Sequence, residues 1–185
     1  MMATTHVFMG MALAATIAAA VAPEHLFPLL VVGAIGGLVP DFDVVFDHRK
    51  TFHFPVFYSV ATVLCVGLAI VVQSVWALVL VVGMASAALH SVSDIFGNGN
   101  EYNPWNATSQ KAVYNHALGR WHRPRYVIRY DGAPEDLFLC AAFAVPVYLI
   151  APPELHAWIL LGMFISAGYA VGRKPIGAWA ERHGL

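Results

Sequence analysis

The chain has 185 residues, of which 59% are hydrophobic, and it carries only 10 basic and 11 acidic side chains. A water-soluble fold of this size needs more charge to cover its surface, so this composition and a mean hydropathy of +0.65 argue against that class. A net charge of −1 provides no basic field for nucleic acid. We therefore expect an all-α integral membrane protein, a single domain over residues 1–185 whose main partner is the lipid bilayer.

Six apolar runs follow one another along the chain, and each predicts a helix of a transmembrane bundle. They cover residues 7–22, 26–39, 54–72, 75–96, 137–151 and 155–172. A hydrocarbon core of about 30 Å requires roughly 20 helical residues. The second run is shorter than this and contains Gly33, Gly36 and Gly37, so we expect a half-spanning or closely packed helix there.

The connecting segments divide into two sets by charge. Residues 23–25, 73–74 and 152–154 contain no Lys or Arg, whereas all ten basic residues lie in the remaining segments and near the C-terminus. Six spans bring these basic segments to one side, which the positive-inside rule assigns to the cytoplasm together with both termini. The longest polar stretch, residues 97–136, is predicted to form a folded cytoplasmic cap.

Histidine and aspartate residues from distant segments fall at this same cytoplasmic side. They are His6, Asp41, Asp43, His53, His90 and Asp94. His90 and Asp94 are spaced i and i+4, so they share one face of a helix and suit a common metal ion. Ionisable residues at membrane depth are costly and usually face a partner or a cavity. We predict that His6, Asp41, His53, His90 and Asp94 are metal ligands.

The segment after the second run carries the remaining candidates. An extended chain after Pro40 would point Asp41 and Asp43 to opposite sides, so we expect one to bind metal and Asp43 to act as general base. The ligand from the next few residues is either His48 or His53, and His53 is preferred because it leads into the third run. Arg49 is predicted to hold an anionic substrate, since guanidinium groups bind phosphate bidentately.

The order of these motifs resembles the YdjM-type family of membrane-bound, metal-dependent hydrolases, its archaeal branch in particular. The matching pieces are Thr5-His6, Pro40-Asp41-Phe42-Asp43, His48-Arg49-Lys50-Thr51-Phe52-His53 and His90-Ser91-Val92-Ser93-Asp94, followed by Asn103-Pro104-Trp105 and Tyr130-Asp131-Gly132. The resemblance implies a helical membrane fold and a hydrolase activity that depends on a divalent metal. Many members have Thr-His-Ser where this chain has Thr51-Phe52-His53-Phe54, so the carry-over to His53 is less direct.

We therefore expect a metal-dependent hydrolase that acts at the cytoplasmic interface on a phospholipid or other phosphoester. Mixed His and Asp ligands favour Zn²⁺, with Mn²⁺ or Mg²⁺ as alternatives if carboxylates dominate. Two other classes stay open: a small transporter or ion-binding membrane protein, and a non-catalytic structural or regulatory membrane protein. A transporter requires a polar path to both sides, and the opposite side offers few polar residues.

Overall fold

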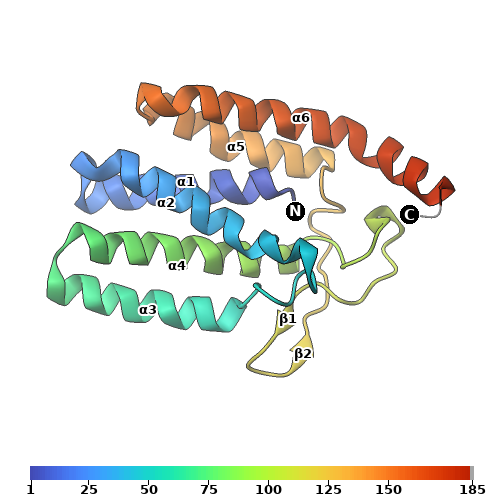
Figure 1. The fold of residues 1–185 in the computed structure, drawn as a ribbon, viewed down its shortest axis with the longest axis horizontal. Helices are drawn as coiled ribbons and strands as arrows, with labels where there is room; N and C mark the ends of the chain where they lie inside the picture. The colour runs from blue at the N-terminus through green and yellow to red at the C-terminus, as the bar shows by residue number, and fades with distance from the viewer. Residues whose placement is uncertain (184–185) are drawn as a thin grey trace.

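The computed structural model describes residues 1–183 and forms the predicted all-α bundle (Figure 1). Its six α-helices are α1 (Ala3–Val21), α2 (Leu26–Leu38), α3 (Pro55–Val72), α4 (Val75–Ser93), α5 (Pro134–Ile150) and α6 (Pro153–Arg182). In the described part of the chain, five segments are long and apolar enough to cross a membrane. The chain is thus a multi-pass membrane protein by length and composition.

The second span is the one whose helix is short, as the sequence predicts. α2 has 13 residues, but 3-10 turns precede and follow it, namely η1 (Pro23–His25) and η2 (Val39–Val45). Together they make an apolar segment of 23 residues. The expectation of an extended chain after Pro40 is wrong, because Asp41 and Asp43 lie within η2.

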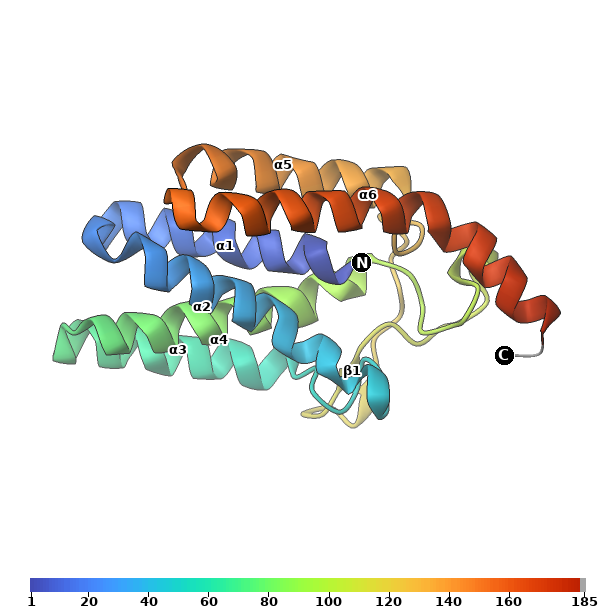
Figure 2. The same ribbon diagram turned by 45° about the horizontal axis from the view of Figure 1, so that its top comes forward.

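All three short connections lie at one end of the bundle, and both termini lie toward the other (Figure 1). The second end also carries the loop between η2 and α3, the long connection between α4 and α5, and the C-terminal part of α6, which continues beyond the bundle (Figure 2). The ten basic residues belong to these segments. The structure therefore has the one-sided charge distribution on which the topology prediction depends.

The helices α1, α2 and α4 pack closely because glycines face one another's backbones. A methyl group added at Gly10 would overlap the carbonyl oxygen of Gly33, and one at Gly36 would lie 2.6 Å from the carbonyl oxygen of Gly83. At Gly37 the added methyl would overlap the carbonyl oxygen of His6. Small residues allow this approach between membrane helices, where apolar surfaces gain little by leaving lipid.

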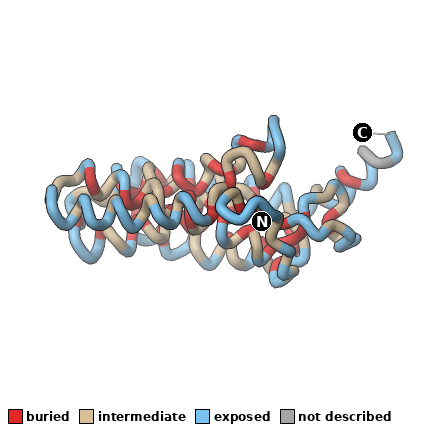
Figure 3. The backbone as a smooth tube through the Cα atoms, turned by 90° about the horizontal axis from the view of Figure 1, so that it is seen from below, coloured by how far each residue is buried: buried red, intermediate tan, exposed pale blue. Residues whose placement is uncertain are grey.

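Buried residues concentrate inside the bundle, whereas exposed residues follow the outer faces of the helices (Figure 3). Phe8, Leu29, Leu30 and Ile159 are among the largest side chains of this core. Along α3 only Pro55 is buried, so nearly all of this apolar helix is available to lipid.

The polar stretch after α4 is mostly irregular and includes a two-stranded antiparallel ribbon, β1 (Tyr114–Asn115) and β2 (Arg120–Trp121). The polar stretch was predicted to extend to residue 136, but α5 already begins at Pro134. Asp136 therefore belongs to α5, where it is fully buried. Its carboxylate accepts hydrogen bonds from the Met2 backbone at 2.7 Å and the Thr5 hydroxyl at 2.7 Å, which ties the beginning of α1 to α5.

Candidate metal centre

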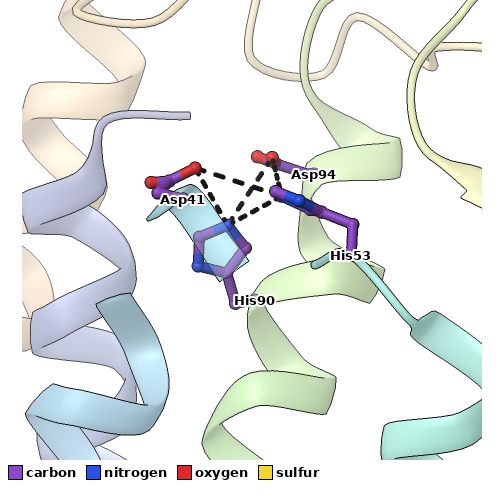
Figure 4. Close-up of side chains that lie close together, drawn as sticks. All are labelled: Asp41, His53, His90 and Asp94. Atoms are coloured by element: carbon purple, nitrogen blue, oxygen red, sulfur yellow. Dashed lines mark hydrogen bonds and ion pairs between the residues drawn. The ribbon is translucent and has the colours of Figure 1, made fainter. Parts of the chain in front are cut away.

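Four predicted ligands converge at the basic end of the bundle (Figure 4). Asp41 comes from η2, His53 from the loop before α3, and His90 from the last turn of α4. Asp94 follows at the start of η3 (Asp94–Phe96), one turn after His90. One ligand atom from each residue lies within 4.8 Å of the other three. Segments about fifty residues apart thus supply a single set of donors.

The spacing of these atoms fits a tetrahedral ion. The Nε2 atoms of His53 and His90 are 3.1 Å apart. Asp41 Oδ1 lies 3.4 Å from His90 Nε2 and 4.0 Å from His53 Nε2. Asp94 Oδ2 lies 3.4 Å from His53 Nε2 and 3.8 Å from His90 Nε2. Zinc bonds of about 2.0–2.1 Å place tetrahedral ligands about 3.3 Å apart, so small adjustments complete the coordination shell.

Both imidazoles are held with their Nε2 lone pairs toward this centre. His90 Nδ1 donates to the carbonyl oxygen of Gly37 at 2.6 Å, and His53 Nδ1 donates to Asp43 Oδ2 at 2.9 Å. When both rings are neutral and protonated at Nδ1, their Nε2 lone pairs face each other and cannot form a hydrogen bond, whereas in the metal-free site a proton on His53 Nε2, favoured by the raised pKa of this ring, can bridge to His90 or Asp94. A cation between them resolves the conflict, and carboxylate or carbonyl partners of this kind orient metal-bound histidines in general.

Asp43 is the centre of the loop between η2 and α3. Its side chain is fully buried and accepts from the imidazole Nδ1 atoms of His48 and His53, both at 2.9 Å. The backbone N–H groups of Arg49, Lys50 and Phe52 donate to the same carboxylate at 3.1–3.2 Å. These contacts turn Asp43 away from the donor cluster and use both of its oxygens. They favour a positioning role over the predicted role of general base.

His6 reaches the centre without joining the four-atom group. Its Nε2 lies 3.0 Å from Asp94 Oδ1, the oxygen that faces away from His53. Its ring stacks on His90 with the centroids 3.6 Å apart. The α-amino group of Met1 lies 2.7 Å from the same Asp94 oxygen. In this arrangement His6 orients Asp94 and His90, whereas the sequence predicted that it binds metal directly.

Arg49 lies behind Asp94 and is buried. Its Nε is 3.5 Å from Asp94 Oδ2 and has no hydrogen-bond partner, while its terminal nitrogens donate to the backbone and side-chain oxygens of Asn98. The Arg49 backbone has a φ of +61°, a conformation that costs a residue with a side chain about 1 kcal/mol. The hydrogen bond from its backbone to Asp43 helps to maintain this turn.

The electrostatic environment of the cluster favours positive charge. Burial by itself lowers the pKa of His53, but hydrogen bonds to Asp43 and Asp94 and the charges of both carboxylates raise it to about 9. The acidic residues therefore more than offset the cost of a buried cation at this position. The two negative charges of Asp41 and Asp94 would balance the two positive charges of a bound divalent ion.

A cavity of about 850 Å³ adjoins the cluster, with Asp41, His48 and Arg49 on its wall. Asp41 is the most exposed of the four ligands, with a side chain that is 18% accessible against 2% or less for the others. The cavity is therefore the route from solvent or lipid to the cluster. The sequence did not predict it, because its walls come from η2, the start of α1, the polar stretch after α4, and α6.

The other histidines have separate environments. His116 donates from Nε2 to the carbonyl oxygen of Lys50 at 2.7 Å, and His122 lies 3.1 Å from the Asn115 amide. His25 and His156 lie in or next to short connections at the opposite end of the bundle, as the topology predicted. Sequence reasoning missed the part played by the Gly37 carbonyl, since a backbone acceptor leaves no signal in residue type.

Comparison of the chain with protein-family models, with curated proteins and with solved structures yields no match.

Proposed function

We propose that this chain is a membrane-embedded, metal-dependent hydrolase that cleaves a phosphoester at the cytoplasmic interface, with Zn²⁺ as its preferred metal. The observation that carries the proposal is the pair of Nε2 atoms, 3.1 Å apart, on imidazoles whose Nδ1 atoms are already engaged. Two aspartate oxygens complete a four-donor set beside a cavity. A catalytic zinc needs a position for water, which here would require either that Asp41, the candidate ligand on the cavity wall, gives up its place or that the shell expands to five.

A divalent metal supplies two effects: it lowers the pKa of a bound water to about 7, and it polarises a phosphoryl oxygen. The protein supplies the rest. Arg49 contributes a buried positive charge beside Asp94 and faces the cavity, where it would attract the anionic phosphoryl group. Hydrolysis adds one water across the P–O bond, with the hydroxyl group going to phosphorus and the proton to the departing alcohol oxygen.

His48 is the residue best situated to move that proton. It lines the cavity, its Nδ1 donates to Asp43, and its side chain is 31% exposed. A carboxylate on Nδ1 fixes the ring and leaves Nε2 as the proton-exchanging atom. Because Asp43 is enclosed by five donors, His48 replaces it as our candidate for general acid and base.

The cytoplasmic location remains a prediction from the charge distribution, and membership of the YdjM-type family remains a prediction from the motifs. The motifs are what favour a hydrolase. A continuous transport path is less compatible with a cluster at one end of the bundle and short connections with few polar residues at the other.

Metal analysis of the purified protein tests the proposal first. We expect about one divalent ion per chain, lost in His90→Ala and in Asp41→Ala. The control is His25→Ala, which removes an imidazole at the opposite end of the bundle and should leave the metal in place. Absence of metal from the unmodified protein, after growth with zinc and with manganese, would refute the site.

Hydrolysis is then measured with soluble and lipid phosphoesters. We expect activity that depends on the metal and falls by at least 100-fold in His90→Ala. Activity that persists without His90 and without metal would contradict the proposed mechanism even if the ion binds.

A further inference from the structure

The cavity beside the metal centre has a polar end and an apolar side. The polar end is formed by Asp41, His48 and Arg49, together with Asn98 from the connection after α4. The apolar lining comes from the end of α2, from η2 and from α6, and Glu101, Asp131 and Arg173 also lie on the wall of the cavity. A volume of about 850 Å³ is much larger than an inorganic phosphate needs and lies in the upper part of the range for cavities that hold organic ligands.

One face of α6 provides half of the apolar side. Ile165, Tyr169, Arg173 and Ile176 line the cavity, and their spacing of three or four residues places them in one row along the helix. The row starts within the apolar part of the span and ends in its basic part. At the basic end Arg173 Nε contacts Asp131 Oδ2 at 2.8 Å, and the Tyr169 hydroxyl donates to the same oxygen.

Other large apolar residues of the cavity come from the end of α2 and from η2. Leu38, Phe42 and Val44 line the cavity, and Phe42 and Val44 are 55% and 67% exposed. Ile165 and Ile176, across from them, are 51% and 60% exposed. α6 packs on α5 and more lightly on α1, so these walls are not pressed together. The two segments belong to helices that are long and apolar enough to cross a membrane, where lipid would be the surrounding medium.

We infer that this cavity binds a phospholipid from the surrounding leaflet, with its acyl chain between η2 and α6 and its phosphate toward Arg49 and the metal centre. The inference rests on the proposed function and names its substrate class, a lipid phosphoester that reaches the site sideways from the bilayer. Charge supports the orientation, because Arg49 and the expected cation lie at one end and apolar side chains at the other. A small soluble phosphoester would leave the apolar walls without a partner.

Binding is tested with two phosphonates that share a phosphatidic-acid head group and resist hydrolysis. One carries oleoyl chains and the other acetyl chains. Metal-loaded full-length protein in detergent should bind the oleoyl compound at least 10-fold more tightly. Ile165→Trp, which fills the acyl-chain region, should remove this preference and leave the affinity for the acetyl compound unchanged.

The matched control is Val171→Trp, which adds an indole to the same helix at a position that is 80% exposed and does not line the cavity. It should bind both compounds like the unmodified protein, and it corrects for partition of the long-chain compound into micelles. Ile176→Trp serves as a second filling variant if Ile165→Trp fails to fold. Equal affinities for the two phosphonates, or equal effects of the filling and control variants, would overturn the inference.

Hydrolysis assays on the same variants separate this inference from the proposed function. Metal-dependent cleavage of a soluble phosphoester, with no chain-length preference and no effect of Ile165→Trp, would retain the hydrolase and reject the lipid site. Selective binding of the oleoyl phosphonate without cleavage of any phosphoester would retain the lipid site and reject the hydrolase.

Discussion

The replacement Asp43→Asn tests whether the loop carboxylate positions the metal-binding histidines. Oδ1 accepts from His48 at 2.9 Å and from the Arg49 backbone at 3.2 Å, while Oδ2 accepts from His53 and two further backbone groups. An asparagine retains one acceptor oxygen and turns an NH₂ group toward the remaining donors. In its best orientation it keeps the three bonds at Oδ2 and loses the two at Oδ1.

The cost follows from those two losses. A buried donor left without a partner costs about 1–3 kcal/mol, which applies to the Arg49 N–H, whereas the partly exposed His48 ring can turn to water. The free energy of unfolding should therefore fall by about 1–3 kcal/mol. The weaker acceptor also holds the His53 ring less firmly, and loss of such a partner typically lowers metal affinity by about 10–100-fold. We expect both effects in the same variant, because one carboxylate orients the loop and the ligand.

Metal affinity is measured by competition with a chelator, and stability by thermal unfolding in detergent. The control is Asp47→Asn in the same loop, which removes the same charge from a side chain that is 72% exposed and 3.1 Å from Lys50 Nζ. Pairs this exposed contribute about 0–1 kcal/mol, so the control should behave almost like the unmodified protein. Equal metal affinity in the two variants would refute the positioning role of Asp43.

Three further predictions address packing, the role of His6 and topology. Gly37→Ala should lower the free energy of unfolding by about 1–3 kcal/mol and weaken metal binding, because the added methyl group would overlap the His6 backbone. The control Gly67→Ala places its methyl group in open space and should change neither thermal unfolding nor metal content. His6→Ala should retain one metal per chain with about 10–100-fold lower affinity, and complete loss of metal would instead identify His6 as a ligand. In a variant without native cysteines, an impermeant thiol reagent added to intact cells should label Gln73→Cys and spare Lys111→Cys, and the reverse pattern would invert the proposed orientation.

The fold was predictable because a membrane constrains the chain so strongly. Apolar runs, prolines at the beginnings of helices and the separation of charge gave six helices and their connections in the right order. The boundaries were less predictable, and α5 begins three residues before its apolar run because Pro134 suits a first helical position. The irregular chain between α4 and α5 has no periodicity, so its two-stranded ribbon and its contacts had no signal in the sequence.

The sequence identified the residues of the donor cluster, but it did not show which of the nearby side chains bind a metal and which only position the ligands. Its i, i+4 pair could be identified from helix geometry, and topology brought Asp41 and His53 to the same end of the bundle. The division of work between Asp41 and Asp43 depends on a 3-10 turn, since side chains two residues apart in such a turn point about 120° apart around its axis. The contact of His6 with the far oxygen of Asp94 depends on the packing of α1, which no local pattern describes.

The packing of α1 against α2 and the orientation of the metal centre are coupled through one residue. Gly37 lets the backbone of α1 approach at His6, and its own carbonyl oxygen accepts the hydrogen bond that fixes His90. The His6 ring then stacks on the His90 ring and donates to Asp94, so the close approach of two helices sets the positions of two ligands. A side chain at Gly37 would push α2 away from α1 and shift the carbonyl oxygen to which His90, on α4, donates. Gly37 therefore serves the donor cluster as well as the bundle, which is why a change in helix packing should appear in the proposed metal affinity.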